Sequence, residues 1–156
     1  MIGRLVRAED FQRVLRTQAR ARSEHFAIHH LPACPSRARQ RAASSVTTEL
    51  STAIAPGPDN SVDDSLETGC GRWLGLVVPK RHARRSVTRT LLKRQIRSAV
   101  GRSAAELDAG LWVVRLRTPF DPVRFVSAAS PRLAAAAASE LAVLLGAVRR
   151  PLTLSA

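Results

Sequence analysis

The segment KRHARRSVTRTLLKRQIR, residues 80–97, concentrates the chemistry that this sequence offers to a partner. It contains no Asp or Glu, and eight of its residues are basic: Lys80, Arg81, Arg84, Arg85, Arg89, Lys93, Arg94 and Arg97. The chain has 25 Lys and Arg in all, so about a third of its basic residues lie here without a counter-charge. Guanidinium groups bind phosphate through paired hydrogen bonds. The segment therefore predicts a site for a polyanion.

The same segment predicts a helix from about residue 86 to residue 100. Leu92, Ile96 and Val100 recur every four residues, and a basic row lies about 60° around the axis. The members of the basic row are Arg85, Arg89, Lys93 and Arg97. The apolar row would dock on a sheet, and successive charges beside it would lie about 6 Å apart. Such charges repel by a few tenths of a kcal/mol per pair, so a partner is expected to neutralise them.

Three partners or environments could explain this helix: solvent alone, an anionic membrane or nucleic acid. A solvated face would interleave Glu with the basic residues, and this segment has none. A membrane-lying helix would need a bulky apolar face with aromatic residues, which is also missing here. The formal charge of +13 and the pI of about 11.7 favour nucleic acid.

The surrounding sequence predicts the elements that must position this helix. Apolar residues at helical spacing (Phe11, Val14 and Leu15) indicate a first helix. The expected order is helix 8–20, strand 25–31, strand 72–79, basic helix 86–100, strand 110–119 and helix 131–148. In the last helix, Ser130 is the expected N-cap, Pro131 the first residue, and Gly146 marks the expected start of its end. We expect one domain over residues 1–148 and a tail over 149–156.

Residues 33–70 differ in composition from the rest of the chain. They are rich in Ser, Thr, Ala and Pro, and residues 36–65 contain one Leu and no aromatic residue. Such a segment buries too little apolar surface to offset the entropy of ordering it, so we expect a disordered insertion. Cys34 and Cys70 are expected to be ordinary thiols without a metal or redox role. The N-terminal residues lack the apolar core of a signal peptide, and the expected location is the cytoplasm.

The chain offers no evident catalytic constellation. The four histidines (His25, His29, His30 and His82) do not have metal-ligand spacing. His25 and His29 lie on one predicted strand about 13 Å apart, which is too far for a shared metal. No cluster of Asp or Glu could hold two catalytic metals. These residues therefore predict a non-catalytic role, with no metal or other cofactor bound by the protein.

The strand ending LGLVVPKR, followed by HARRSVTRTLLKRQIR, resembles the protein subunit of bacterial ribonuclease P. That family carries a basic pair and then R-N-R-x-x-K-R-x-x-R on its second helix. The matching residues here are Lys80, Arg81, Arg89, Lys93, Arg94 and Arg97. Thr90 and Leu91 stand where the family has Asn and its second Arg, which puts any contact from residue 91 in doubt. RLVRAEDFQRVLR and HFAIHHL are similar to the family's opening, so the resemblance covers residues 4–31 and 72–148.

The resemblance implies an α/β fold, an α+β sandwich in which helices pack on a small mixed sheet. The implied element order is α-β-β-α-β-α. It also implies that the βαβ crossover through the basic helix is left-handed. Physical rules alone would favour a right-handed crossover.

The resemblance further implies an auxiliary subunit of an endoribonuclease that removes the 5′ leader of precursor tRNA. An RNA subunit with bound Mg²⁺ performs the chemistry, and the expected partners are that RNA and precursor tRNA, with no membrane and no required protein partner. The implied contacts to the catalytic RNA are Lys80, Arg81, Arg84, Arg85, Arg89 and Arg94. The implied leader-binding cleft contains Phe11, Leu15, Ala27, His29, Lys93 and Arg97. Phe and His can stack on bases without sequence preference.

Two other functions remain open at this point. A basic ribosomal or ribosome-assembly protein would bind RNA without assisting any cleavage. A protein-only nuclease would need acidic metal ligands, which the sequence does not supply. Binding to ribonuclease P RNA and rescue of leader cleavage at low Mg²⁺ would separate these possibilities.

Overall fold

The computed structural model describes residues 1–36 and 71–149. The elements along the chain are β1 (Ile2–Arg4), α1 (Ala8–Leu15), β2 (Ala19–Arg22), β3 (Phe26–Leu31), β4 (Arg72–Val77), α2 (Ser86–Arg102), the 3₁₀ turn η1 (Ala104–Glu106), β5 (Gly110–Leu116) and α3 (Pro131–Val148). This mixed α/β order contains the expected α-β-β-α-β-α order and adds two short strands. Most of the expected insertion 33–70 and of the expected tail 149–156 lies outside the described residues.

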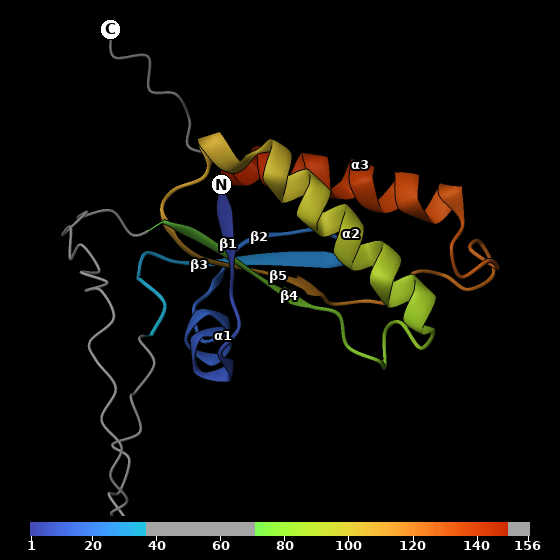
Figure 1. Ribbon diagram of the computed structural model, residues 1–156. Helices are drawn as coiled ribbons and strands as arrows, with labels where there is room; N and C mark the ends of the chain where they lie inside the picture. Colours follow the sequence, from blue (N-terminus) through green and yellow to red (C-terminus); the bar gives the residue numbers. More distant parts are fainter. Residues whose placement is uncertain (37–70, 150–156) are drawn as a thin grey trace, which may run out of the picture. The chain divides into compact units, whose positions relative to one another are not determined.

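The five strands form one mixed sheet in the order β1-β4-β5-β3-β2 (Figure 1). β4 is parallel to both β1 and β5, and the chain passes from β4 to β5 through α2. β3 is antiparallel to β5 and β2. The parallel β4-α2-β5 unit needs a long crossover, and a 17-residue helix supplies it. The left hand of this crossover stays an expectation from the resemblance.

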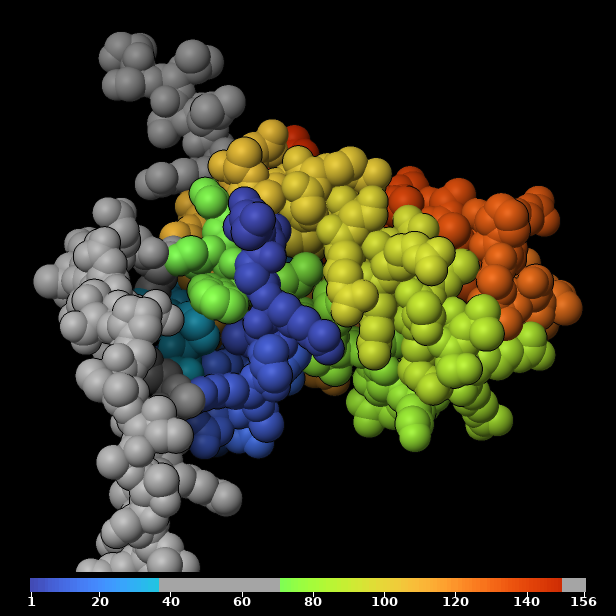
Figure 2. Space-filling view, in the orientation of Figure 1, coloured from blue at the N-terminus to red at the C-terminus, as the bar shows by residue number. Residues whose placement is uncertain are grey.

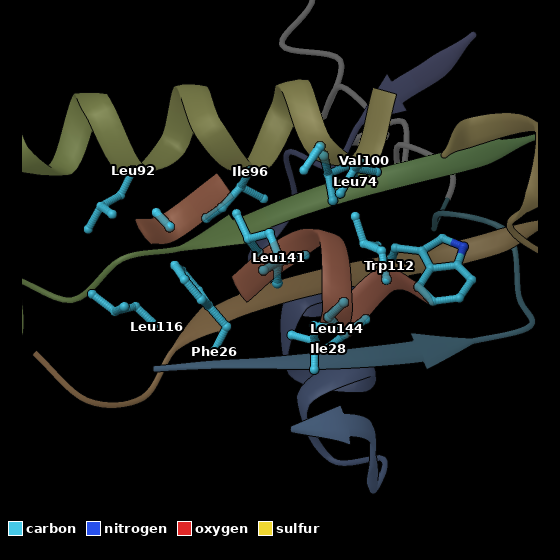
Figure 3. Close-up of a cluster of buried hydrophobic side chains, with 14 of the residues drawn as sticks. Phe26, Ile28, Leu74, Leu92, Ile96, Val100, Trp112, Leu116, Leu141 and Leu144 are labelled. Carbon is cyan, nitrogen blue, oxygen red and sulfur yellow. The ribbon is translucent and has the colours of Figure 1, made fainter. Parts of the chain in front are cut away.

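The sheet has one face covered by α2 and α3 and another that carries α1 (Figure 1). The α2 and α3 side holds the larger core, in which side chains from both helices meet those of the strands (Figure 3). Its fully buried members include Phe26, Ile28, Leu92, Ile96 and Leu141. Each such side chain contributes roughly 1.5–3 kcal/mol by leaving water. This core fixes α2 against the sheet, with Leu92, Ile96 and Val100 inward as their spacing predicts.

The N-terminal third differs from the sequence expectation. The first helix ends at Leu15 rather than residue 20, and the Thr17 hydroxyl donates to the Val14 carbonyl (2.6 Å) where the helix stops. Residues 19–22 then form β2, whose alanines are half-buried and whose arginines are exposed. β1 was also missed. Three or four residues carry too little periodicity to identify a strand, and pairing with β4 and β3 holds these two in place.

The C-terminal helix follows its sequence signals closely. The Ser130 hydroxyl accepts a hydrogen bond from the Arg132 amide (3.2 Å), and Pro131 is the first helical residue. Gly146 does not begin the end, because the helix continues to Val148. α3 is long and apolar enough to span a membrane by length and composition, but its leucines pack in the core of this fold.

The expectation that Cys34 is an ordinary free thiol is wrong, because Cys34 is disulfide-bonded.

Candidate nucleic-acid interface

The basic row of α2 lies where its spacing places it, beside the buried row. Arg85 and Arg97 are exposed, whereas Arg89 and Lys93 are half-buried. Arg94 and Lys80 are also exposed. Within the described part of the chain, none of the eight basic residues of segment 80–97 pairs with a carboxylate. The charges on this side of α2 are therefore available to an anionic partner.

Arg89 has a structural role that the sequence did not reveal. Its guanidinium Nη1 donates to the carbonyl oxygens of Ala83 (3.0 Å) and Arg84 (2.7 Å). These bonds hold the turn before α2 against the first turns of the helix. Arg89 thus fixes the direction in which Arg84 and Arg85 leave the chain, and its own contact with a phosphate would use its remaining donors.

A groove with a volume of about 430 Å³ runs between the N-terminal strand and α2. We call it the edge groove because it lies at the β1–β4 edge of the sheet. Its lining includes Phe11, Lys93 and Arg97, so the structure brings together three residues that the resemblance placed in one cleft. Arg4 from β1 adds a third cation. Figure 2 shows the N-terminal strand, in blue, beside the yellow turns of α2, the helix that carries Lys93 and Arg97.

Gly75 in β4 sets the position of the Phe11 ring. A Cβ atom at residue 75 would lie 2.5 Å from Cε1 of Phe11, so the ring rests directly on the backbone of this strand. Phe11 is half-buried there, beside Leu5 and the smaller core. The ring therefore has a fixed place at the groove wall and keeps part of its surface exposed, as a stacking platform requires.

Ala27 and His29 line a different hollow, with a volume of about 370 Å³, on the α1 side of the sheet. Both are nearly buried, and the His29 ring nitrogen Nδ1 lies 3.0 Å from the Thr17 carbonyl oxygen. They form the floor of this sheet-face hollow, and the remaining lining residues are Arg22, Arg115, Arg117 and Thr118. Its three arginines were not among the expected site residues. Alternation along β5 places Arg115 on this face, and Arg117 follows directly after the strand ends at Leu116.

The expected leader cleft is thus divided between two basic hollows. Leu15 packs in the smaller core with Val14 and Val113, which is a structural contact. Arg4 could not be recognised from the sequence, because only the pairing of β1 with β4 brings it near α2.

Arg81, Arg84 and Arg85 line a third hollow, of about 490 Å³, together with residues 119–128. We call this third hollow the loop pocket. It lies at the opposite end of α2 from the edge groove: its α2 residues Thr88 and Leu92 are in the first turns, whereas those of the edge groove reach Gly101. The basic surface along α2 therefore has a hollow at each end.

The histidines serve the fold in three of four cases. His25 pairs with Glu140 (Nδ1–Oε2, 2.8 Å), His29 contacts Thr17, and His30 stacks on Trp112 at 4.1 Å. Burial lowers the pKa of His30 below its usual value, which keeps this ring neutral near pH 7. In the described residues, no three His, Cys, Asp or Glu side chains lie together in a way that could hold a metal ion.

Comparison with known proteins adds to this geometry. Residues 3–130 match the family described as Ribonuclease P. The chain is 31% identical to the ribonuclease P protein component of Burkholderia mallei over 148 residues, which cover 95% of this chain and 83% of the relative. It is 29% identical to that of Paraburkholderia xenovorans, with 97% and 84% covered.

A solved structure supports the fold independently. The RNase P protein of Staphylococcus aureus superposes with a TM-score of 0.56 at 17% identity, covering 96% of this chain and all of that one. The mixed sheet of five strands with three helices is therefore a known architecture. The family match and the relatives show that the chain belongs to the ribonuclease P protein family.

Proposed function

We propose that this chain binds the RNA subunit of ribonuclease P and the 5′ leader of precursor tRNA, and so assists removal of the leader. The observation that carries the proposal is the uncompensated basic face of α2, which ends in a groove with a half-exposed aromatic ring. Cations along α2 suit a phosphate backbone, and Phe11 suits an unpaired base. The names of the relatives, ribonuclease P protein components, support the same partners.

The proposed division of roles follows the three hollows. The edge groove takes the leader through Phe11, Lys93 and Arg97, with Arg4 as an additional phosphate ligand. The sheet-face hollow, with Arg115 and Arg117, extends this path across the sheet toward β3 and β2. The face of α2 and the preceding turn take the RNA subunit through Lys80, Arg81, Arg84, Arg85, Arg89 and Arg94.

In this proposal the protein supplies binding and charge, and the RNA subunit supplies the catalytic chemistry with its own Mg²⁺. The chain needs no protein-bound cofactor for that role. It acts in the cytoplasm, where precursor tRNA is processed. Neutralising phosphates on two approaching polyanions releases counterions, which makes binding strongly dependent on salt.

A reconstitution experiment tests the proposal. The chain is added to a bacterial ribonuclease P RNA and a precursor tRNA at low Mg²⁺, and release of the 5′ leader is followed over time. We expect cleavage only when the RNA subunit is present, and faster cleavage when the protein is added. Unchanged cleavage after addition of the protein would favour a general RNA-binding role, and metal-dependent cleavage by the protein alone would contradict the proposal.

Phe11→Ala sharpens the leader assignment. Stacking on one base is worth roughly 1–3 kcal/mol, so affinity for a precursor with a leader should fall about tenfold or more. Affinity for mature tRNA should change little. An equal loss for both RNAs would show that Phe11 serves only the packing against Gly75.

A further inference from the structure

The loop pocket contains a segment to which neither the family signature nor the proposed leader path gives a role. Residues 119–128, between β5 and α3, fold against the first turns of α2. The Thr88 hydroxyl donates to the Ala128 carbonyl oxygen (3.0 Å), and Arg85 Nη1 donates to that of Val126 (3.4 Å). Figure 2 shows the orange segment beside the yellow-green start of α2.

An aromatic stack fixes the other side of this segment. The Phe120 ring lies flat on His25, with centroids 3.9 Å apart and planes within 5°, and meets Phe125 edge-on at 5.7 Å. His25 is itself held by Glu140 of α3 through its ring and its backbone amide. The pocket walls are therefore attached to both long helices, so the hollow exists before any partner binds.

The pocket combines an apolar interior with a cationic rim. Leu92 and Leu133 are almost fully buried beneath it, and Phe120 and Phe125 are half-buried in its wall. Arg81, Arg84 and Arg85 belong to its lining, which contains no acidic residue. Exposed apolar residues gather nearby, since Val126 is 75% and Val123 80% exposed.

A nucleotide matches both parts of this pocket. A flat, weakly polar base suits the apolar interior and the aromatic wall. The phosphates on either side of that base suit three guanidinium groups that have no carboxylate partner among the described residues. An apolar peptide would use the interior but leave the arginines uncompensated. RNA is also favoured because these arginines continue directly into the basic row of α2.

We infer that the loop pocket accepts one unpaired base of the ribonuclease P RNA, with Arg81, Arg84 and Arg85 at the flanking phosphates. The inference rests on the proposed function. It makes residues 119–128 part of the RNA-binding surface. The base contributes contacts that do not depend on salt, in addition to the salt-dependent contacts of the arginines.

Two valines provide a matched pair for the test. Val126 lines the pocket, Val143 lies on the outer side of α3, and both are 75% exposed. Changing either to Ser removes the same atoms and leaves the charge unchanged, so the cost to folding should be equally small. Phe125→Ala is the stronger variant, and Val126→Ser keeps the test valid if loss of the Phe125 ring loosens the segment.

Affinity of each full-length variant for a bacterial ribonuclease P RNA is measured over a series of salt concentrations. Phe125→Ala should weaken binding about tenfold, and Val126→Ser should weaken it severalfold, while Val143→Ser binds like the parent chain. The plot of log K against log salt should shift downward with unchanged slope, because no phosphate contact is lost. Equal behaviour of Val126→Ser and Val143→Ser, or a change of slope, would overturn the inference.

Modification interference then tests whether the pocket holds a base. The RNA is sparsely modified in two preparations, with dimethyl sulfate (at A, C and G) and with the carbodiimide CMCT (at U and G), and bound and unbound molecules are separated. A methyl group with its positive charge, or the large carbodiimide adduct, should exclude the inserted base from a pocket rimmed by arginines, so one site should interfere with the parent chain and not with Phe125→Ala. Identical interference maps would overturn the inference while leaving the proposed function in place. Failure of the parent chain to bind this RNA at all would overturn both.

Discussion

Helices α2 and α3 lie beside each other on one face of the sheet (Figure 1). The surface that α2 presents to the solvent is basic, whereas that of α3 is nearly uncharged. They have nearly the same length, 17 and 18 residues, and both bury a row of aliphatic side chains. α2 carries five basic residues and no acid, whereas α3 carries only Arg132 and Glu140. Glu140 accepts hydrogen bonds from Ser23 and His25, so its charge serves the fold.

The difference shows how little the fold determines the outer side of a helix. The sheet needs one apolar row from each helix, and the remaining positions are free to meet another requirement. The chain has a formal charge of +13, yet the outer face of α3 consists mostly of Ala, Ser and Val. The lack of charge on α3 therefore shows, as much as the basic face of α2 does, that the cations are concentrated on one helix. Under the proposed function, this distribution of charge favours an approach of RNA from the α2 side.

The largest expected effect is a loss of stability when the buried row of either helix is changed. Ile96→Ala in α2 and Leu141→Ala in α3 each remove a fully buried side chain from the same core. Each should lower the free energy of unfolding by roughly 2–5 kcal/mol, measured by urea denaturation. Val143→Ala on the outer face of α3 should change it by less than about 0.5 kcal/mol. A small loss for only one of the buried pair would show that the helices are not equivalent toward the core.

The next effect is a loss of RNA binding when the basic row, which only α2 carries, is changed. Changing Lys93, Arg94 and Arg97 together to Gln should lower the slope of log K against log salt by about two units, at roughly 0.7 per phosphate contact. The slope is measured for binding to ribonuclease P RNA that holds precursor tRNA, because Arg94 is assigned to the RNA subunit and Lys93 and Arg97 to the leader. Thermal stability should stay the same or rise slightly, because like charges along the helix are removed. Arg89 is left out because its bonds to Ala83 and Arg84 would confuse binding with folding.

The control for this variant is Arg132→Gln on α3. It removes a cation that is exposed and lies outside the basic row, so the slope should fall by much less than one third of the α2 effect. A fall per residue as large as that on α2 would mean that RNA responds to net charge and not to the helix.

The inward charge of α3 gives a smaller, pH-dependent effect. Burial alone would raise the pKa of Glu140, but hydrogen bonds from Ser23 and His25 outweigh it and hold the pKa below the usual 4.5. A depressed carboxyl pKa stabilises the fold above the usual value, and this contribution is lost as the pH falls through the folded-state pKa. Glu140→Gln should therefore cost about 1–3 kcal/mol at pH 7 and progressively less in acid.

Urea denaturation of both chains between about pH 3 and about pH 7 measures the difference in the free energy of unfolding. The free energies of unfolding should converge at the acid end. A constant difference across the range would show that the charge of Glu140 does not contribute.

The sequence predicted the elements that carry strong local signals. α3 was found with its cap because Ser130 and Pro131 precede a long apolar row, and α2 was found because its two rows keep a strict four-residue spacing. β1 and β2 were missed because pairing with distant strands stabilises them. Short edge strands of this kind have almost no pattern of their own.

The residues of the candidate site also fall into those that the sequence predicts and those that only the fold brings together. The basic row of α2 could be predicted because its residues are neighbours in sequence. Arg4, Arg22 and Arg115 could not, because the sheet brings them to their hollows from three separate strands. The loop pocket was also invisible, since its walls come from segments about 40 residues apart that meet only in the folded chain.

The smallest expected effect comes from moving charge between the two helices. The variant combines Arg94→Gln and Arg97→Gln on α2 with Ser139→Arg and Val143→Arg on α3, which leaves the formal net charge at +13. Both α3 positions are exposed and lie one turn apart, as do consecutive cations on α2. Packed helices lie about 8–10 Å apart, and the screening length at physiological salt is about 8 Å. The relocated cations should therefore recover little RNA binding. Screened surface charges contribute at most a few tenths of a kcal/mol to the binding free energy. The affinity should accordingly stay within about twofold of the variant that carries only the two α2 substitutions. Both variants are compared at one salt concentration near the physiological value. Full recovery would show that RNA responds to total charge and would remove the distinction between α2 and α3.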